Sequence, residues 1–205
     1  EGAFLDAIAS DQPTPGGGSA SAYGAAMAAS LVAMVAFVTV GKKKYADVET
    51  EMQTLIEEAS QLQKIMREAV KKDADSFVDY MEARRLPKDT DQEKEIRNRA
   101  IHAATINAAA IPLFVAQHAL KILQLALTAA ELGNVNAISD AGSAGALAKA
   151  ALEGAGLNVR INLLGIEDDP VPSRMLDELR KLEKQAAVLD ESIRKALNER
   201  GGLNL

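Results

Sequence analysis

Two carboxylates occur in parts of this sequence where a charge is not expected. Asp73 continues a stripe of apolar residues that begins at Met52 and advances in steps of three and four, so it falls on the core face of a helix. Asp140 lies within 133-GNVNAISDAGSAGALAKAAL-152, where the only other charge is Lys149. Burial raises the pKa of a carboxyl group and suits it to exchange protons near neutral pH. We therefore predict Asp140 first, and Asp73 second, as catalytic acid–base groups.

Each carboxylate also has a purely structural interpretation. Asp73 could lie at a solvated helix end, and a modest bend would exchange its place with Asp75, which otherwise faces the surface. The same stripe continues from Asp73 to Ser76 and Tyr80, which also places polar groups on the core face. Asp140 could instead accept a backbone N–H as a cap near a helix start.

A glycine-rich turn precedes a long uncharged run in 13-PTPGGGSASAYGAAMAAS-30. Gly16, Gly17 and Gly18 let the backbone turn and come close to another group, and Ser19 stands where a buried helix begins. Free N–H groups at such a start could hold an anionic or carbonyl oxygen. A plain tight turn would use the same residues. We predict that these four residues line a ligand site.

Composition sets limits on the function. The 205 residues suit one domain, 1–205, and the net charge of −6 argues against nucleic-acid binding. Without cysteine there is neither a disulfide nor a thiolate metal site, and two isolated histidines do not form a zinc centre. Residues 17–41 are uncharged and long enough to span a bilayer, but their many small residues favour a buried core helix. No signal-peptide pattern precedes them, so we expect a cytoplasmic protein without a membrane partner.

Helical periodicity runs through most of the chain. Residues 46–85 and the stripe from Leu179 to Leu197 have the pattern of amphipathic helices. Residues 91–132 predict a long helix that Pro112 should kink or break, followed by a helix over 135–155. Only 157-LNVRINLLGI-166 could form a short strand, and it could equally be helical. The fold class is therefore all-α, a bundle of long, partly buried helices. Its apolar stripes exceed what one thin bundle can cover, which predicts a dimer.

Five segments together resemble a known family. They are 13-PTPGGGSASA-22, 41-GKKKYADVE-49, 73-DADSFVDYMEARRLPK-88, 133-GNVNAISDAG-142 and 158-NVRINL-163. In this order, over about residues 10 to 165, they are similar to the formiminotetrahydrofolate cyclodeaminase and methenyltetrahydrofolate cyclohydrolase family. The resemblance implies an all-helical homodimer that binds a tetrahydrofolate derivative.

The resemblance also implies a reaction. In cyclodeamination, N10 of 5-formiminotetrahydrofolate attacks the formimino carbon and ammonia leaves, giving 5,10-methenyltetrahydrofolate. In the alternative, a cyclohydrolase, water opens the same cation to 10-formyltetrahydrofolate. Both need an acid and a base, and neither needs a metal or any cofactor beyond the folate substrate. A non-catalytic helical oligomerisation module is a further alternative, supported by the C-terminal apolar stripe.

The remaining predicted substrate-binding residues lie in two of the matching segments. Asn134, Asn136 and Ser139 accompany Asp140, although Asn134 could also cap the next helix. The basic group Lys42, Lys43 and Lys44 would attract the glutamate tail of a folate, which can be polyglutamylated, or could simply complement a helix end. His102 and His118 lie outside the matching segments, and we expect structural roles for both.

Overall fold

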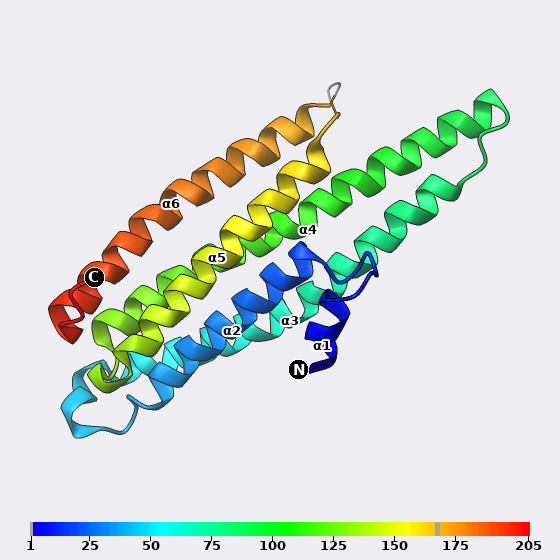
Figure 1. Cartoon of the computed structure of the whole chain (residues 1–205). Coiled ribbons are helices and arrows are strands. Elements are labelled where there is room, and N and C mark those ends of the chain that lie inside the picture. The colour runs from blue at the N-terminus through cyan, green and yellow to red at the C-terminus, as the bar shows by residue number, and fades with distance from the viewer. Residues whose placement is uncertain (1, 167–168) are drawn as a thin grey trace.

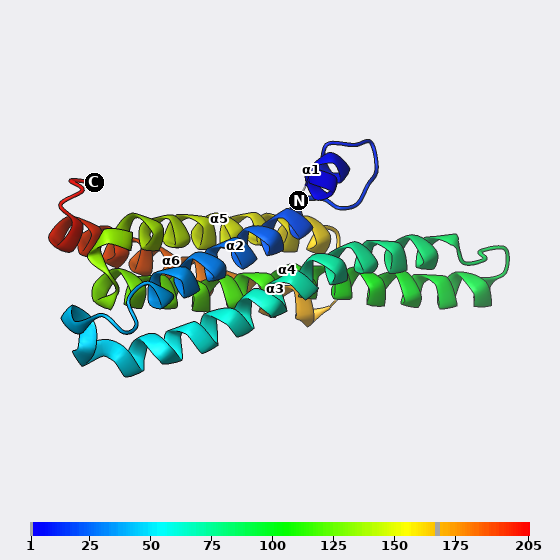
Figure 2. The same ribbon diagram turned by 90° about the horizontal axis from the view of Figure 1, so that it is seen from below.

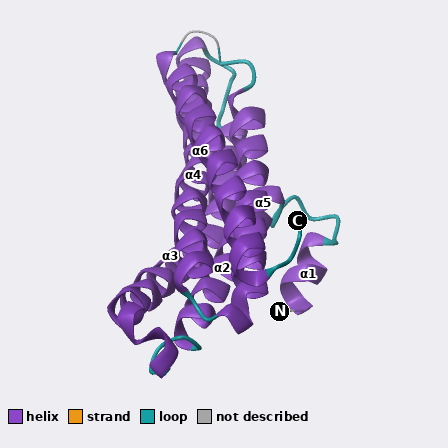
Figure 3. Ribbon diagram, turned by 90° about the vertical axis from the view of Figure 1, so that its left-hand side faces the viewer, coloured by secondary structure: helices purple, strands orange, loops and turns teal. Residues whose placement is uncertain are grey.

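The chain folds into a bundle of long helices (Figure 1). The structure is a computed structural model that describes residues 2–166 and 169–205. Five long helices follow the short α1 (Gly2–Ile8): α2 (Gly17–Phe37), α3 (Glu49–Arg85), α4 (Asp91–Leu132), α5 (Ile138–Leu163) and α6 (Pro170–Gly201). Two short 3-10 helices, Lys43–Val48 and Val135–Ala137, lie in the connections. Within the described residues every regular element is a helix, as Figure 3 shows, which confirms the predicted all-α class.

The core is built from small side chains that let the helices approach closely. α2 packs between α3 and α5 and also touches α4, while α6 covers α4 and α5. A methyl group added at Gly154 of α5 would lie 2.6 Å from the hydroxyl of Ser21 in α2. One added at Gly145 would lie 2.9 Å from Ile193 in α6. The glycines of α5 therefore sit where neighbouring helices come nearest.

The predicted apolar stripes are confirmed. On α3 the six stripe residues from Met52 to Ala69 are all buried. On α6, Leu179, Ala186 and Ile193 are buried against the rest of the bundle. Burial of one face of each helix is what aligns them side by side.

Two predicted helix boundaries differ in the structure. α4 runs through Pro112 as one helix of 42 residues, so Pro112 does not break it. Its side chain is buried among the other helices, and their packing supports the helix where the backbone hydrogen bond of Pro112 is missing. α5 continues to Leu163 instead of ending near 155, and it includes most of the segment 157–166 that could have been a strand. Packing of α5 against α2, α4 and α6 overrides the weak helix propensity of its glycines.

Two helices meet the length and hydropathy expected of a membrane span. They are α2 and α4, and 56% of the most apolar window of each is buried inside the bundle. Core helices of a bundle have the same composition, so length and hydropathy alone are weak evidence for a membrane.

Two parts of the molecule extend beyond the bundle. The end of α3 and the beginning of α4 form a helical hairpin that projects past the other helices (Figures 1 and 2). Thr90 and Glu93 close this hairpin with a capping box at the start of α4. On another side α1 stands off from the face made by α2 and α5, as Figures 2 and 3 show. Ring contact between Phe4 and Tyr23, with centroids 4.8 Å apart, links α1 to α2.

Candidate active site

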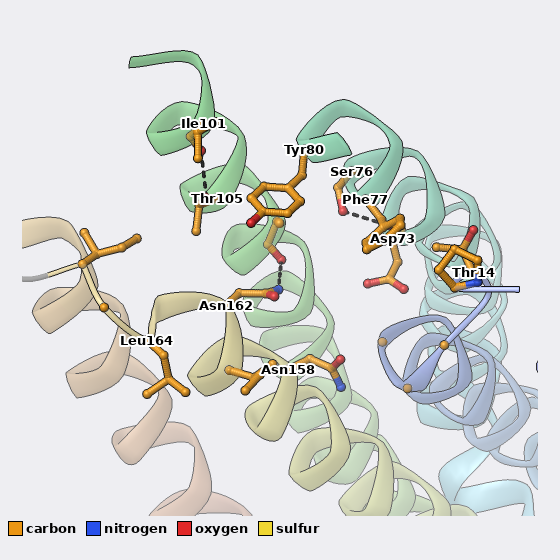
Figure 4. Close-up of a pocket in the computed structure, with 18 of the residues that line it drawn as sticks. Thr14, Asp73, Ser76, Phe77, Tyr80, Ile101, Thr105, Asn158, Asn162 and Leu164 are labelled. Carbon is orange, nitrogen blue, oxygen red and sulfur yellow. Dashed lines mark hydrogen bonds between the residues drawn. The ribbon is translucent and has the colours of Figure 1, made fainter. Parts of the chain in front are cut away.

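A cavity of about 620 Å³ lies where the projecting hairpin joins the bundle. The start of α2 forms one wall, the end of α5 and the turn after it form a second, and α3 and α4 form the rest (Figure 4). This volume is in the usual range for a small-molecule site. Its lining includes Gly16, Gly17, Gly18, Asp73, Ser76, Phe77, Tyr80, Asn98, His102, Asn158 and Asn162.

Asp73 projects from α3 toward the start of α2 (Figure 4). The hydroxyl of Ser19 donates a hydrogen bond of 2.8 Å to its Oδ2. Gly16, the residue before α2, has no side chain to cap the helix, so the Asp73 carboxylate supplies negative charge at that helix start from another helix. The carboxylate that interrupts the apolar stripe of α3 therefore faces both a helix N-terminus and the cavity.

A glycine is required at position 18, in the first turn of α2, because Asp73 occupies the space of a side chain there. A Cβ atom at this position would lie 2.6 Å from Cγ of Asp73, well inside the normal contact distance of two carbon atoms. The missing side chain thus lets the carboxylate reach the helix start. At Gly17 a Cβ would lie 3.2 Å from Nδ2 of Asn158, which is a tight but milder contact. The Thr14–Pro15 peptide bond in the preceding turn is cis.

Burial of the Asp73 side chain makes ionisation of its carboxyl group less favourable. Burial raises the pKa of the carboxyl group above its ordinary value of 3.8, and the hydroxyl and backbone N–H of Ser19 oppose the shift. A raised pKa moves a carboxyl group toward the range in which it can both accept and return a proton. A titratable group of this kind in a cavity is typical of an active site.

The other walls add amides, aromatic rings and a histidine. Asn158 and Asn162 each donate through Nδ2 to a backbone carbonyl, of Gly154 at 2.8 Å and of Ala108 at 2.7 Å. These bonds orient both amides at the cavity wall. On the hairpin, Phe77 and Tyr80 offer flat apolar surfaces on which a ring system can stack.

His102 lines the same cavity and also contacts the start of α6. Its Nε2 lies 3.1 Å from Oδ2 of Asp169, the residue that caps α6. His118 follows the expectation, because its Nδ1 is bonded to the carbonyl oxygen of Phe114 at 2.8 Å. In the part of the chain that the structure describes, no three His, Asp or Glu side chains gather as a metal site would require.

Several predictions about α3 are confirmed. Ser76 is buried, Tyr80 lines the cavity with Asp73, and Asp75 is exposed. The residues that sequence analysis did not select are mainly Asn158 and Asn162 on α5. Both lie in the matching segment 158-NVRINL-163, and reading that segment as a helix would have put them one turn apart on the same face.

The fold of one chain does not bring Asp140 to this cavity. Asp140 precedes Asn158 by 18 residues in the same helix, which is about 27 Å along its axis. Asn136 and Ser139 are exposed near Asp140, at the far end of the bundle. Lys42, Lys43 and Lys44 are also exposed at that end, in the turn that follows α2. Within one chain the predicted site residues thus form two separate groups. Gly16–Ser19 lie with Asp73 at the cavity, and the others lie at the far end of the bundle.

Asn134 differs from its predicted role as a substrate-binding residue. It is buried, its backbone N–H donates to Oγ1 of Thr39 at 2.8 Å, and its Nδ2 donates to the carbonyl of Val38 at 3.0 Å. Its Oδ1 accepts a bond from the N–H of Asn136 at 3.1 Å. These bonds fasten the turn after α2 to the start of α5, so its polar atoms already have partners. The alternative prediction, that Asn134 caps a helix, is confirmed at the 3-10 helix Val135–Ala137.

Comparison with known proteins gives consistent results over nearly the whole chain. The model of a protein family described as Formiminotransferase-cyclodeaminase matches residues 2–181. A methenyltetrahydrofolate cyclohydrolase of Methylorubrum extorquens is 41% identical over 93% of this chain and 91% of its own length. The crystal structure of a formiminotetrahydrofolate cyclodeaminase from Thermotoga maritima superposes with a TM-score of 0.85, at 33% identity, over 96% of this chain and 94% of that one.

A longer relative shows the same domain in a larger protein. The formimidoyltransferase-cyclodeaminase of Sus scrofa is 30% identical over 89% of this chain, which spans only 34% of that protein. The family match, the two relatives of similar length and the all-helical fold agree with one another. We conclude that this chain belongs to the formiminotransferase-cyclodeaminase family of folate enzymes.

Proposed function

We propose that the chain hydrolyses 5,10-methenyltetrahydrofolate to 10-formyltetrahydrofolate. The observation that carries this proposal is the carboxyl group of Asp73, which has a raised pKa and faces a ligand-sized cavity. From the sequence we predicted cyclodeamination first and hydrolysis as the alternative; here hydrolysis is the first candidate and cyclodeamination the second. The reason is that the relative named as a cyclohydrolase is 41% identical and matches over almost the full length of both chains.

Hydrolysis requires three proton transfers around one carbon: one from the attacking water, one to N5 and one from the hydroxyl of the adduct. Water adds to the cationic carbon between N5 and N10 and loses a proton, which gives a neutral tetrahedral adduct. The bond from this carbon to N5 then breaks as N5 gains a proton and the hydroxyl of the adduct loses one, so the carbon remains on N10 as a formyl group. The net change adds one water and releases one proton. A carboxyl group with a raised pKa can take the first proton and return one to N5.

Asp73 also offers charge stabilisation. In its ionised form the carboxylate faces a substrate that carries a positive charge at the reacting carbon, and it would hold that carbon close. The folate ring system would stack on Phe77 or Tyr80, with the amides of Asn158 and Asn162 bonded to its polar edge. The N–H groups of Gly17 and Gly18 at the start of α2 would bind a ligand oxygen.

Cyclodeamination of 5-formiminotetrahydrofolate is the second candidate. The structural likeness to the Thermotoga maritima cyclodeaminase favours it, because the two chains superpose over nearly their full lengths. The reaction proceeds through a similar tetrahedral carbon, from which ammonia leaves in place of the ring nitrogen. Asp73 would take the N10 proton and protonate the departing amine.

One absorbance assay separates the two reactions. The 5,10-methenyl cation absorbs in the near ultraviolet, so a cyclohydrolase removes the signal from the methenyl substrate and a cyclodeaminase creates it from the formimino substrate. Asp73→Asn should lower the turnover by about a hundredfold or more with folate affinity largely kept. A chain that turns over neither substrate, although it binds folate, would overturn the proposal and favour a non-catalytic helical module.

We also propose that the chain acts as a homodimer and takes polyglutamylated folates. Exposed apolar residues on α2, among them Met27, Met34 and Phe37, support the dimer, because water contacts them in a single chain. Lys42, Lys43 and Lys44 support the second proposal, since exposed ammonium groups attract the carboxylates of a glutamate tail.

A further inference from the structure

A second group that can transfer protons lines the cavity. Among the described residues of its lining, the ionisable side chains are Asp73 and Tyr80 of α3 and His102 of α4. Imidazole is the side chain that most readily gains and loses a proton near neutral pH. In Figure 4, Ile101 and Thr105 of α4 lie across from Asp73, on the other side of Tyr80. The cavity therefore has a carboxyl group on one wall and an imidazole on another.

Asp169 holds one ring nitrogen of His102. Nε2 of His102 lies 3.1 Å from Oδ2 of Asp169. The other carboxylate oxygen, Oδ1, accepts the backbone N–H of Val171 at 2.7 Å, because Asp169 is the N-cap of α6. A neutral imidazole carries its proton on one nitrogen and a lone pair on the other. With Nε2–H toward the carboxylate, Nδ1 keeps the lone pair and can act as a base.

Exposure to solvent distinguishes His102 from Asp73. The side chain of His102 is 46% exposed. Asp73 is half-buried against the start of α2, where the hydroxyl of Ser19 donates a hydrogen bond to it. The imidazole thus borders both the cavity and the bulk water, and a proton that it carries can reach solvent without crossing the core.

Hydrolysis of the methenyl cation needs such an outlet for one proton. Asp73 takes a proton from the attacking water and gives one to N5, so its carboxylate ends the reaction in the state in which it began. The proton on the hydroxyl of the tetrahedral adduct is left over. It departs as the C–N5 bond breaks, and it must pass to a base and then to solvent before the next turnover.

We propose that His102 accepts this hydroxyl proton, directly or through bound water, and releases it to solvent. The electron pair of the O–H bond becomes the second bond of the formyl C=O group, and the pair of the C–N5 bond takes the proton from Asp73. The imidazole becomes an imidazolium ion, which the Asp169 carboxylate stabilises as a positioning residue. Loss of the proton to water restores the neutral ring, so one proton leaves per turnover. This inference rests on the proposed hydrolysis.

Cyclodeamination does not need the same outlet. The protonated formimino substrate carries one positive charge, and its products are the methenyl cation and neutral ammonia, so the reaction releases no net proton. Hydrolysis starts from the cation and ends with a neutral formyl group and one free proton. His102 is therefore a residue that suits this cavity to hydrolysis in particular.

Two substitutions separate proton transfer from a structural contact. His102→Gln can still donate a hydrogen bond to Asp169 but cannot exchange a proton, and His102→Ala leaves room for a small base. In dilute buffer near neutral pH, each should lower kcat for hydrolysis by about a hundredfold with KM nearly unchanged. Added imidazole should raise kcat of His102→Ala several-fold. The methenyl absorbance gives the rates, and hydrolysis without enzyme is subtracted at each imidazole concentration.

The second histidine of the chain supplies a matched control. His118 is on the same helix, outside the described lining of the cavity, and its Nδ1 is bonded to the carbonyl oxygen of Phe114. His118→Gln should keep the wild-type kcat and should not respond to imidazole. Asp169→Asn still caps α6 but removes the charge beside Nε2, so kcat should fall less than in His102→Gln, and imidazole should raise it.

The outcomes separate this inference from the proposed function. Wild-type kcat in His102→Gln, or a loss in His102→Ala that imidazole does not reverse in a chain with an unchanged Tm, would overturn the role of His102 and leave hydrolysis by the wild type standing. Wild-type kcat in Asp169→Asn would overturn the positioning role of Asp169. A wild-type chain that converts the formimino substrate and not the methenyl one would contradict the proposed function, and this inference with it.

Discussion

Gly18→Ala is the sharpest test of how the carboxylate of Asp73 is positioned. The added methyl carbon would lie 2.6 Å from Cγ of Asp73, whereas two carbon atoms in contact are about 3.5 to 4.0 Å apart. The carboxylate must therefore retreat by about 1 Å, and its bond from Ser19 must lengthen or break. A displacement of about 1 Å of a catalytic group can lower the rate by roughly a hundredfold. We expect a loss of turnover of that size.

Gly24→Ala supplies the matched control in the same helix. Its methyl group would lie 3.9 Å from Cβ of Ala151, an ordinary contact, so turnover should stay unchanged. Both substitutions favour the helical backbone by about 0.5 to 1 kcal/mol, and urea unfolding should show that neither variant is strongly destabilised. The rate is measured by the near-ultraviolet absorbance of the methenyl group. Wild-type turnover in Gly18→Ala would refute the requirement for Asp73 at this position.

Four further predictions concern the same residues, the glycine turn and the turn at the far end of the bundle. In a pH profile, kcat/KM should fall on the acid side with an apparent pKa above 3.8. This fall should be absent in Asp73→Asn. Because the pKa of Asp73 is raised on folding, this group stabilises the protein most below pH 3.8 and loses that effect as pH rises through the folded-state pKa, so Asp73→Asn should keep or raise Tm at neutral pH. Asn134→Ala should lower the free energy of unfolding by about 2 to 3 kcal/mol in urea titrations, since it leaves buried backbone groups unpaired, whereas exposed Asn136→Ala should not. Gly17→Val should weaken folate binding, measured by calorimetry, more than it lowers Tm; loss of stability with unchanged affinity would show that the turn is only architectural.

The candidate site shows where reasoning from the sequence succeeds. Asp73 was found because a helix repeats every 3.6 residues, so a charge on an apolar stripe must point toward the core wherever that helix lies. The same rule placed Ser76 and Tyr80 correctly. Asn158 and Asn162 were missed because their segment shows no clear period, and only the packed helix brings their amides to the cavity wall.

Asn134 and His102 show why chemical type alone is not enough. An amide in a matching segment suggested a ligand contact, but the structure places Asn134 in a buried turn where backbone groups bind its polar atoms. His102 had no sequence partner, because Asp169 is far along the chain and meets it only after α6 packs against α4. Such contacts join distant segments and leave no local pattern to read.

The sequence by itself determined the helices, their apolar faces, the helical class and the family. All of these depend on residues within a few turns of one another or on the order of motifs. Only the tertiary structure decided which motifs share a cavity. α2 and α5 are antiparallel, so Gly17 meets Asn158 while Asp140 lies about 27 Å away on the same helix. Helix propensity and hydrophobic period are short-range properties, whereas the direction and register of packed helices result from contacts across the whole core.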